Sequence, residues 1–331
     1  FVYLAGLESG MTPATIVDDA PIELPQGPGL PVWKPENFSE DFLGPITLRV
    51  ALEKSRNTIS VRVAQQVGMD KVIDEARRFG VGEGLQPFLA AALGANEVTP
   101  IELTTAYAEL VNGGKHIEPL LIERIQDRHG RTIVRADTRS CPGCEHVAWD
   151  GGLPPQLADT RAPVVDPRLA YQMVSMLEGV VQRGTAKAAA SLGKPLAGKT
   201  GTTNDSKDAW FVGFSPDLVI GVFMGYDQPR SLGKHETGAT VALPVWIEAM
   251  GGALKDQPPV PFRTPPGLSL VRIDPATGRL ASPGGSSIVE AFLPGTEPGR
   301  DRSVDPNLVS GDPYAIQGGS RAVPPGSSGL Y

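Results

Sequence analysis

Apolar residues recur at helical spacing in several stretches of the chain, and most of these stretches begin at a residue that can cap a helix. The first stretch has Val2 or Tyr3, Gly6 and Leu7 at this spacing and stops at Gly10, as if the chain began inside a helix. Further helices are predicted from Thr47 to Glu53, from Ile59 to Val67, over 70–79, from Thr99-Pro100 to Gly113-Gly114, and from Asp166-Pro167 to Gly184.

Strand-like alternation dominates other parts of the chain. Residues 118–135 alternate on both sides of an RHG turn, which predicts a surface hairpin. The apolar stretch Val241–Leu254 predicts a helix whose first turn must hold Pro244. Together these patterns predict an α/β (α+β) fold with an antiparallel sheet flanked by helices. Its three neighbouring strands are predicted at Leu196 to Thr202, Ala209 to Phe214 and Leu218 to Tyr226.

Proline and glycine mark the limits of the predicted domain. Residues 11–45 are rich in both and predict an irregular excursion, in which Asp18-Asp19 is interpreted as a hydrophilic turn rather than an acid–base pair. The packed domain is predicted to cover 1–255. Residues 256–331 are predicted to be a largely disordered extension with one strand-like island, LSLVRIDPATGRLA.

Charge and composition narrow the class of protein. The 331 residues are 40% hydrophobic, which is enough for a buried core, and carry a net charge of −7. Nucleic acid is an unsuitable partner, because a surface that follows phosphates needs the opposite sign. No run approaches the roughly 18 apolar residues that span a bilayer.

The segment LAGKTGTTNDSKDAWFVGF, residues 196–214, holds the most distinctive candidate chemistry. Lys199 offers a positive charge, and Thr200 and Thr202 point to the same face of a strand, so both hydroxyls can meet one anionic group. Gly201 lets another backbone approach the strand. Without its neighbours, KTG would fit an ordinary strand with a solvated lysine.

The longer string resembles the class A penicillin-binding proteins, in which almost this sequence follows the KTGT strand. Ser55-Arg56-Asn57 resembles the S-x-N motif of that family, although Ser and Asn in isolation are common caps and turn residues. Similarity extends from Phe1 to about Pro298. Further strings similar to the family are TPIELTTAYA at 99–108, Tyr171-Gln172-Met173 and GVVQRGTA at 179–186.

The resemblance implies the penicillin-binding protein and β-lactamase-like transpeptidase fold. It also implies a D,D-transpeptidase that cross-links stem peptides through an acyl-serine intermediate. In this chain Ser55 would relay protons, Asn57 would hold the substrate amide, and Lys199 would supply positive potential. Thr200 and Thr202 would bind the terminal carboxylate beside Gly201, and the N–H of Thr202 would form half of an oxyanion hole.

The nucleophilic serine of the family belongs to an S-x-x-K motif, which the resemblance places just before Phe1. This fragment alone is therefore expected to be inactive. The SLGK strings at 191–194 and 231–234 are interpreted as coincidences of spacing. Two alternatives stay open: a binding module for wall peptides without catalysis, and a D,D-carboxypeptidase or β-lactamase of the same fold.

The resemblance further implies stem peptides, glycan strands derived from lipid II and β-lactams as partners. It implies a glycosyltransferase domain, a membrane anchor upstream, and a location at the periplasmic face of the inner membrane. No cofactor and no metal are predicted. Cys141 and Cys144 leave open a zinc site with His146, a redox centre, or a local disulfide or idle thiols, and the other three histidines are interpreted as isolated and solvated: His116, His129 and His235.

Overall fold

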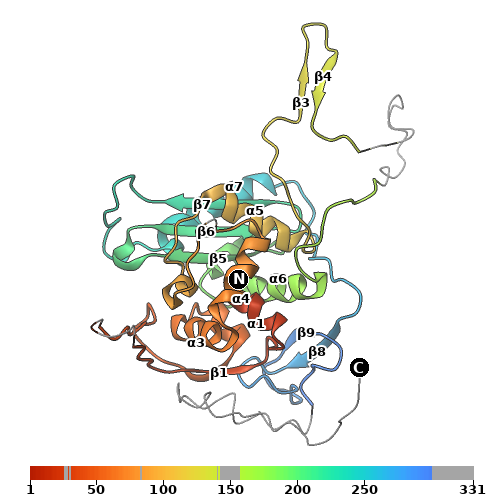
Figure 1. Ribbon diagram of the computed structural model, residues 1–331. Coiled ribbons are helices and arrows are strands. Elements are labelled where there is room, and N and C mark those ends of the chain that lie inside the picture. The colour runs from red at the N-terminus through yellow and green to blue at the C-terminus, as the bar shows by residue number, and fades with distance from the viewer. Residues whose placement is uncertain (26–28, 30, 83, 140, 142–156, 300–331) are drawn as a thin grey trace, which may run out of the picture.

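The computed structural model describes residues 1–331 except 26–28, 30, 83, 140, 142–156 and 300–331. Its central sheet contains the antiparallel strands β5 (Ala197–Thr202), β6 (Ala209–Phe214) and β7 (Val219–Met224) in the order β5-β6-β7 (Figure 1). These are the three predicted strands: β6 has the predicted bounds, and β5 and β7 are slightly shorter. Strand β5, which carries the KTGT residues, forms one edge of this sheet.

The other elements surround this sheet or form small two-stranded sheets beside it. The α-helices in the described part of the chain are α1 (Val2–Glu8), α2 (Leu48–Glu53), α3 (Asn57–Val67), α4 (Met69–Arg78), α5 (Pro100–Val111), α6 (Pro167–Gln182) and α7 (Leu243–Ala253). The short helical turns are η1 (Leu89–Leu93), η2 (Lys187–Leu192), η3 (Asn204–Ser206) and η4 (Gly238–Ala242), the last with π-helical bonding. The two-stranded sheets pair β1 (Ile16–Asp19) with β2 (Gly44–Thr47), β3 (Arg124–Gln126) with β4 (Thr132–Arg135), and β8 (Ser269–Ile273) with β9 (Ile288–Phe292).

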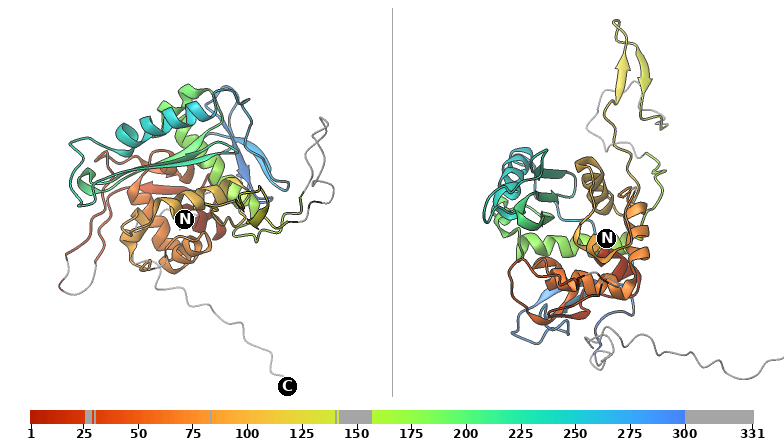
Figure 2. Two further views of the ribbon diagram at one scale, coloured as in Figure 1. Left: turned by 90° about the horizontal axis from the view of Figure 1, so that it is seen from above. Right: turned by 60° about the vertical axis from the view of Figure 1, so that its left-hand side comes forward.

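Helices cover both faces of the central sheet, as the sequence predicts (Figures 1 and 2). On one face, the Phe211 ring of β6 packs edge-on against Trp246 of α7, with 5.0 Å between ring centroids. Phe214, three residues further along β6, packs instead against Tyr107 of α5, at 6.2 Å. Because neighbouring side chains of a strand alternate between faces, β6 anchors a different helix on each side.

Helix capping follows the sequence prediction closely. The Thr47 hydroxyl accepts a hydrogen bond from the N–H of Val50, and Thr99 forms a reciprocal capping box with Glu102. Asp166 caps α6, which contacts α1, α2, α5, β5 and β9 and is mostly buried. Pro244 lies in the first turn of α7, as predicted.

The predicted surface hairpin is present as β3 and β4, which project away from the rest of the molecule (Figures 1 and 2). Every residue of the two strands is exposed. Beyond it, Cys141 is disulfide-bonded, while Cys144 and His146 lie outside the described residues. None of the helices that the structure describes is long and apolar enough to cross a membrane.

The interpretation of residues 11–45 as wholly irregular was wrong. Strand β1 lies within this stretch and pairs with β2 from Ile16↔Thr47 to Asp19↔Gly44. Asp19, interpreted as part of a hydrophilic turn, is fully buried. A strand alternates its faces, so Val17 and Asp19 point inward whereas Asp18 is only half-buried.

Ordered structure continues past the boundary predicted at residue 255. Strands β8 and β9 form a hairpin whose Glu290 and Phe292 are fully buried. Gln172 of α6 donates a hydrogen bond to the carbonyl of Ala291 over 2.7 Å, and Thr47 donates to the carbonyl of Pro275 over 2.8 Å. The hairpin therefore packs on the helices of the domain. The last part of the extension predicted to be disordered, 300–331, lies outside the described residues.

Candidate active site

The structure brings Lys199 and Ser55 into contact. The Lys199 Nζ atom donates a hydrogen bond to the Ser55 Oγ atom over 2.7 Å and a second bond to the carbonyl of Thr200 over 2.9 Å. Lys199 projects from the edge strand β5, and Ser55 lies in the turn between α2 and α3. Ser55 has a positive φ of 56°, a backbone conformation that is uncommon for serine and is often found at functional sites.

The environment of Lys199 changes its proton affinity. Burial lowers the pKa of the Lys199 ammonium from the ordinary 10.5 to about 8, because a charged group loses hydration there. At pH 7 the side chain is still mostly protonated and can donate to Ser55. An ammonium with such a pKa can also release its proton within the range in which enzymes exchange protons.

Asn57 opens helix α3, and its amide nitrogen binds the irregular segment. Its Nδ2 atom donates a hydrogen bond to the carbonyl of Glu36 over 2.8 Å. Of the residues predicted to act together, Ser55 and Lys199 are thus joined directly, whereas the Asn57 amide nitrogen is held by the loop before β2. Its amide oxygen remains able to accept a hydrogen bond.

A buried carboxylate anchors the turn from the side of Arg56. Asp19 accepts hydrogen bonds from Arg56 Nε at 2.7 Å, from Asn37 Nδ2 at 2.9 Å and from the N–H of Leu43 at 2.9 Å, and also from the Thr58 hydroxyl. Burial by itself raises the pKa of Asp19, but these donors outweigh burial and leave the pKa lowered. Asp19, which the sequence alone indicated to be part of a hydrophilic turn, therefore supports the S-x-N motif through its hydrogen bonds with Arg56 and Thr58.

The two threonines of β5 bind residues that the sequence analysis did not single out. The hydroxyls of Thr200 and Thr185 share a hydrogen bond of 3.0 Å. The Thr202 hydroxyl accepts a bond of 3.1 Å from the N–H of Gly238, which leaves its own hydrogen able to donate to a ligand. Thr185 lies in the string GVVQRGTA, whose resemblance to the family could have drawn attention to it.

The backbone of η4 lies close to Gly201. The sequence alone did not indicate which segment would approach this glycine. A β-carbon added to Gly238 would lie 2.6 Å from the carbonyl oxygen of Gly201 and would overlap the carbonyl of Trp210. A β-carbon on Gly201 itself would lie 3.2 Å from the β-carbon of Trp210. The absence of a side chain at Gly238 thus lets η4 rest directly on the end of β5.

The side chains of the first SLGK string form hydrogen bonds outside this constellation. The Ser191 hydroxyl donates to the carbonyl of Ala188 at 2.8 Å, and Lys194 donates to the carbonyl of Gln257.

Of the histidines, His116 is not isolated, since its Nδ1 atom lies 2.8 Å from the buried carboxylate of Glu109. Within the described residues, no group of three or more His, Cys, Asp or Glu side chains could hold a metal ion.

Comparison with known proteins identifies this arrangement. The family model described as the penicillin binding protein transpeptidase domain matches residues 1–245. The chain belongs to the penicillin-binding protein transpeptidase family. Penicillin-binding protein 1A of Rickettsia bellii is 47% identical over 296 residues, and that of Pseudomonas aeruginosa is 42% identical over 315 residues.

Solved structures of the penicillin-binding protein family have the same fold. Penicillin-binding protein 1A of Haemophilus influenzae has a TM-score of 0.79 and 35% identity, covering 90% of this chain and 47% of that one. The penicillin-binding protein PonA1 of Mycobacterium tuberculosis, at 23% identity, a TM-score of 0.66 and coverage of 87% and 74%, shares the fold. The resemblance to the class A type and the predicted penicillin-binding fold are both confirmed.

The chain spans only part of the relatives that it matches. The alignments cover 88% of this chain and 37% of the R. bellii protein, and 86% and 38% for the P. aeruginosa protein. More than half of each of these penicillin-binding proteins therefore has no counterpart in the aligned residues.

Proposed function

We propose that this chain is the part of a peptidoglycan D,D-transpeptidase that supplies Ser55, Asn57 and Lys199 to an active site whose nucleophilic serine lies upstream of Phe1. The observation that carries the proposal is the 2.7 Å hydrogen bond from the Lys199 ammonium to the Ser55 hydroxyl. A hydroxyl in contact with an ammonium of lowered pKa can move a proton during acyl transfer. The chain belongs to the penicillin-binding protein transpeptidase family, which supports the interpretation of this contact as part of a transpeptidase active site.

In the proposed reaction, the upstream serine oxygen bonds to the carbonyl carbon that precedes the terminal D-alanine of a stem peptide. The serine proton leaves, the C–N bond breaks, and the departing D-alanine amine takes up a proton. Ser55 lies beside Lys199 and would carry protons between that lysine and the lysine of the S-x-x-K motif. The amine of a second stem peptide then attacks the ester, so that an amide forms and the serine recovers its hydrogen.

The end of β5 is proposed to bind the substrate. The hydroxyls of Thr200 and Thr202 and the charge of Lys199 would hold the terminal carboxylate, because charge-assisted hydrogen bonds favour an anion at this place. Gly201 would leave room for the substrate backbone along the edge of the sheet. The N–H of Thr202 would donate to the developing oxyanion, a contact whose loss raises a barrier by about 3–4 kcal/mol in other enzymes.

The intact protein is proposed to be a bifunctional glycosyltransferase and transpeptidase at the periplasmic face of the inner membrane, held by an anchor upstream. Its partners would be stem peptides that end in D-Ala-D-Ala, glycan strands derived from lipid II, and β-lactams that block the serine. The similarity to penicillin-binding proteins 1A supports this wider assignment. The fragment by itself is proposed to be inactive.

Two other functions remain as alternatives. A wall-peptide binding module would keep the carboxylate contacts at Thr200 and Thr202 but perform no acyl transfer. A D,D-carboxypeptidase or β-lactamase of the same fold would pass the acyl group to water instead of an amine. The string TNDSKDAWFVGF favours the transpeptidase over these alternatives, since it is part of the resemblance to the class A family.

The test is intact-mass spectrometry after incubation with a penicillin, on this chain and on a version extended upstream through the S-x-x-K segment. We expect one penicilloyl adduct on the extended protein and none on this chain. No adduct on either folded protein would favour the binding module. An adduct on this chain would place the nucleophile among its own serines and overturn the roles assigned here.

A further inference from the structure

A chain of buried charges connects the C-terminal hairpin to the turn that holds Ser55. Both oxygens of the Glu290 carboxylate bind the guanidinium of Arg49, through Nε and, at 2.6 Å, through Nη2. The same guanidinium reaches Glu53 Oε1 at 3.5 Å. Glu53 also binds Arg183 Nη2 at 2.6 Å, so charges alternate from β9 through α2 to the end of α6.

Most of this network is buried. The side chains of Arg49, Glu53 and Glu290 are 2%, 3% and 0% exposed. Burial alone lowers the pKa of Arg49, but Glu290 and Glu53 raise it on balance, so the guanidinium stays charged. Removing one partner of such a buried pair leaves the other charge uncompensated, and the network therefore holds its members in one arrangement.

Two glycines of neighbouring segments leave room for Glu53. A β-carbon on Gly179 would overlap the Glu53 carboxylate, and one on Gly184 would overlap the Glu53 carbonyl oxygen. That carbonyl accepts a hydrogen bond of 3.1 Å from the N–H of Thr185, whose hydroxyl binds Thr200. Glu53 is thus joined to the active site through its backbone, and to Arg49 and Arg183 through its side chain.

Ser55 lies two residues after Glu53, at a backbone conformation that needs support. A φ of 56° is unfavourable for a non-glycine residue and persists only where the surroundings impose it. Asp19 fixes the turn at Arg56, after Ser55. The Glu290 network fixes it at Glu53, before Ser55.

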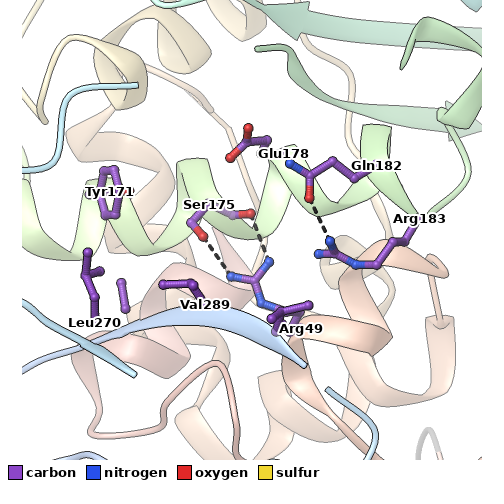
Figure 3. A pocket seen from close by; sticks show the side chains of 10 residues that line it. Arg49, Tyr171, Ser175, Glu178, Gln182, Arg183, Leu270 and Val289 are labelled. Carbon is purple, nitrogen blue, oxygen red and sulfur yellow. Dashed lines mark hydrogen bonds between the residues drawn. The ribbon is translucent and has the colours of Figure 1, made fainter. Parts of the chain in front are cut away.

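Arg49 and Arg183 of this network line a pocket of about 340 Å³ between α6 and the β8–β9 hairpin (Figure 3). Arg49 points from α2 toward Ser175 of α6, to which it donates at 2.9 Å and 2.8 Å. Arg183 lies at the far end of the labelled residues, with its side chain 34% exposed. Water can therefore reach a side chain that replaces Arg183, whereas it cannot reach one that replaces the buried Arg49.

We propose that four positioning residues hold the Ser55 hydroxyl against Lys199: Glu290, Arg49, Glu53 and Arg183. Through them the C-terminal hairpin contributes to the transpeptidase centre. This inference rests on the proposed function. The hairpin acts at a distance, because none of its described residues is among those that contact Lys199. A small displacement of Ser55 is enough to slow a reaction that depends on its alignment.

The test is a double-mutant cycle on the intact protein, with the rate constant for acylation by a fluorescent penicillin as the readout. We expect Glu290→Gln to slow acylation about tenfold or more while one label per molecule is still reached. In a Ser55→Ala background the same change should cost less than about twofold, because a residue that acts only through Ser55 has no further effect once its hydroxyl is gone. Glu23→Gln, which breaks the exposed ion pair with Lys34, is the matched control.

Each outcome separates the two proposals. If the wild-type intact protein is not labelled, the proposed function fails and the inference falls with it. If it is labelled but Glu290→Gln has no effect, or slows both backgrounds equally, the inference alone is overturned. Should Glu290→Gln fail to fold, the same cycle with Arg183→Gln at the solvent-accessible end of the network decides the question by the same criterion.

Discussion

The ammonium of Lys199 donates a 2.7 Å hydrogen bond to the hydroxyl of Ser55 across a separation of 144 residues. The contact joins the edge of the central sheet to the turn between two helices. Lys199 projects from a paired strand, and Ser55 lies between Glu53 and Arg56, which both form ion pairs. This geometry leads to specific expectations for single substitutions.

Ser55→Ala is expected to slow acylation of the intact protein by penicillin about a hundredfold or more, because a positioned proton carrier contributes roughly 10²–10⁴-fold. The melting temperature should change little. The rate of labelling by a fluorescent penicillin measures the effect. Ser191→Ala is the control, since Ser191 is the exposed serine of an SLGK string. Equal rates for Ser55→Ala and wild type would remove Ser55 from the mechanism.

Lys199 is expected to make stability depend on pH. Its folded-state pKa of about 8 lies below the ordinary 10.5, so below pH 8 the folded protein bears the full cost of the buried charge. Between about pH 8 and 10.5 the folded state releases the proton while the unfolded state keeps it, and stability rises with pH. The cost removed is on the order of 3 kcal/mol.

Lys199→Met should abolish this part of the pH dependence. Urea unfolding of the chain at pH 7.5 and pH 10 compares the variant with wild type, and we expect the rise in unfolding free energy to be smaller in the variant. Lys187→Met, at an exposed position, controls for the loss of a lysine in general. An unchanged rise in Lys199→Met would show that Lys199 is well hydrated.

Thr202→Val is expected to slow acylation by about tenfold or more, because the charged β-lactam carboxylate loses the hydrogen bond that the Thr202 hydroxyl donates. A hydrogen bond to a charged group is worth about 1.5–3 kcal/mol. Thr202→Ser keeps the hydroxyl and should retain most of the wild-type rate. The two variants differ in one donor and can be compared by labelling kinetics at subsaturating penicillin. A valine variant as fast as the serine variant would exclude Thr202 from carboxylate binding.

Asp19→Ala is expected to destabilise the chain by about 3–5 kcal/mol, because it leaves the buried guanidinium of Arg56 without its inner partner. Asp18→Ala, one residue earlier on the opposite face of β1, should cost about 0.5 kcal/mol or less. The midpoint of urea unfolding measures both. Equal losses for the two variants would mean that Asp19 contributes no more than its half-buried neighbour.

The same carboxylate gives an acid limit to stability. The folded-state pKa of Asp19 is lowered, so its stabilisation is present above the unfolded pKa and is lost as pH falls through the folded value. Wild type should therefore lose more stability than Asp19→Ala between neutral pH and about pH 3. Parallel pH profiles for the two proteins would contradict this expectation.

Local sequence patterns were sufficient to predict most helices and the central strands. The caps at Thr47, Thr99 and Asp166 bind the backbone within two or three residues, so each helix start depends only on its own neighbourhood. The residues of the KTGT strand and the S-x-N turn were likewise found from their own short strings and the resemblance that these carry. Such features are readable because their interactions close within a few residues.

Contacts between distant segments had to come from the tertiary structure. Asp19 looked like part of a polar turn because its hydrogen-bond donors, at Asn37, Leu43 and Arg56, lie 18 to 37 residues later in the chain. The hairpin at 269–292 looked like part of an extension because the partner of its Glu290 is Arg49, 241 residues earlier. Burial can make a charge stabilising only when its partners are in place, and no local pattern of residue types reveals partners that the fold brings from so far away.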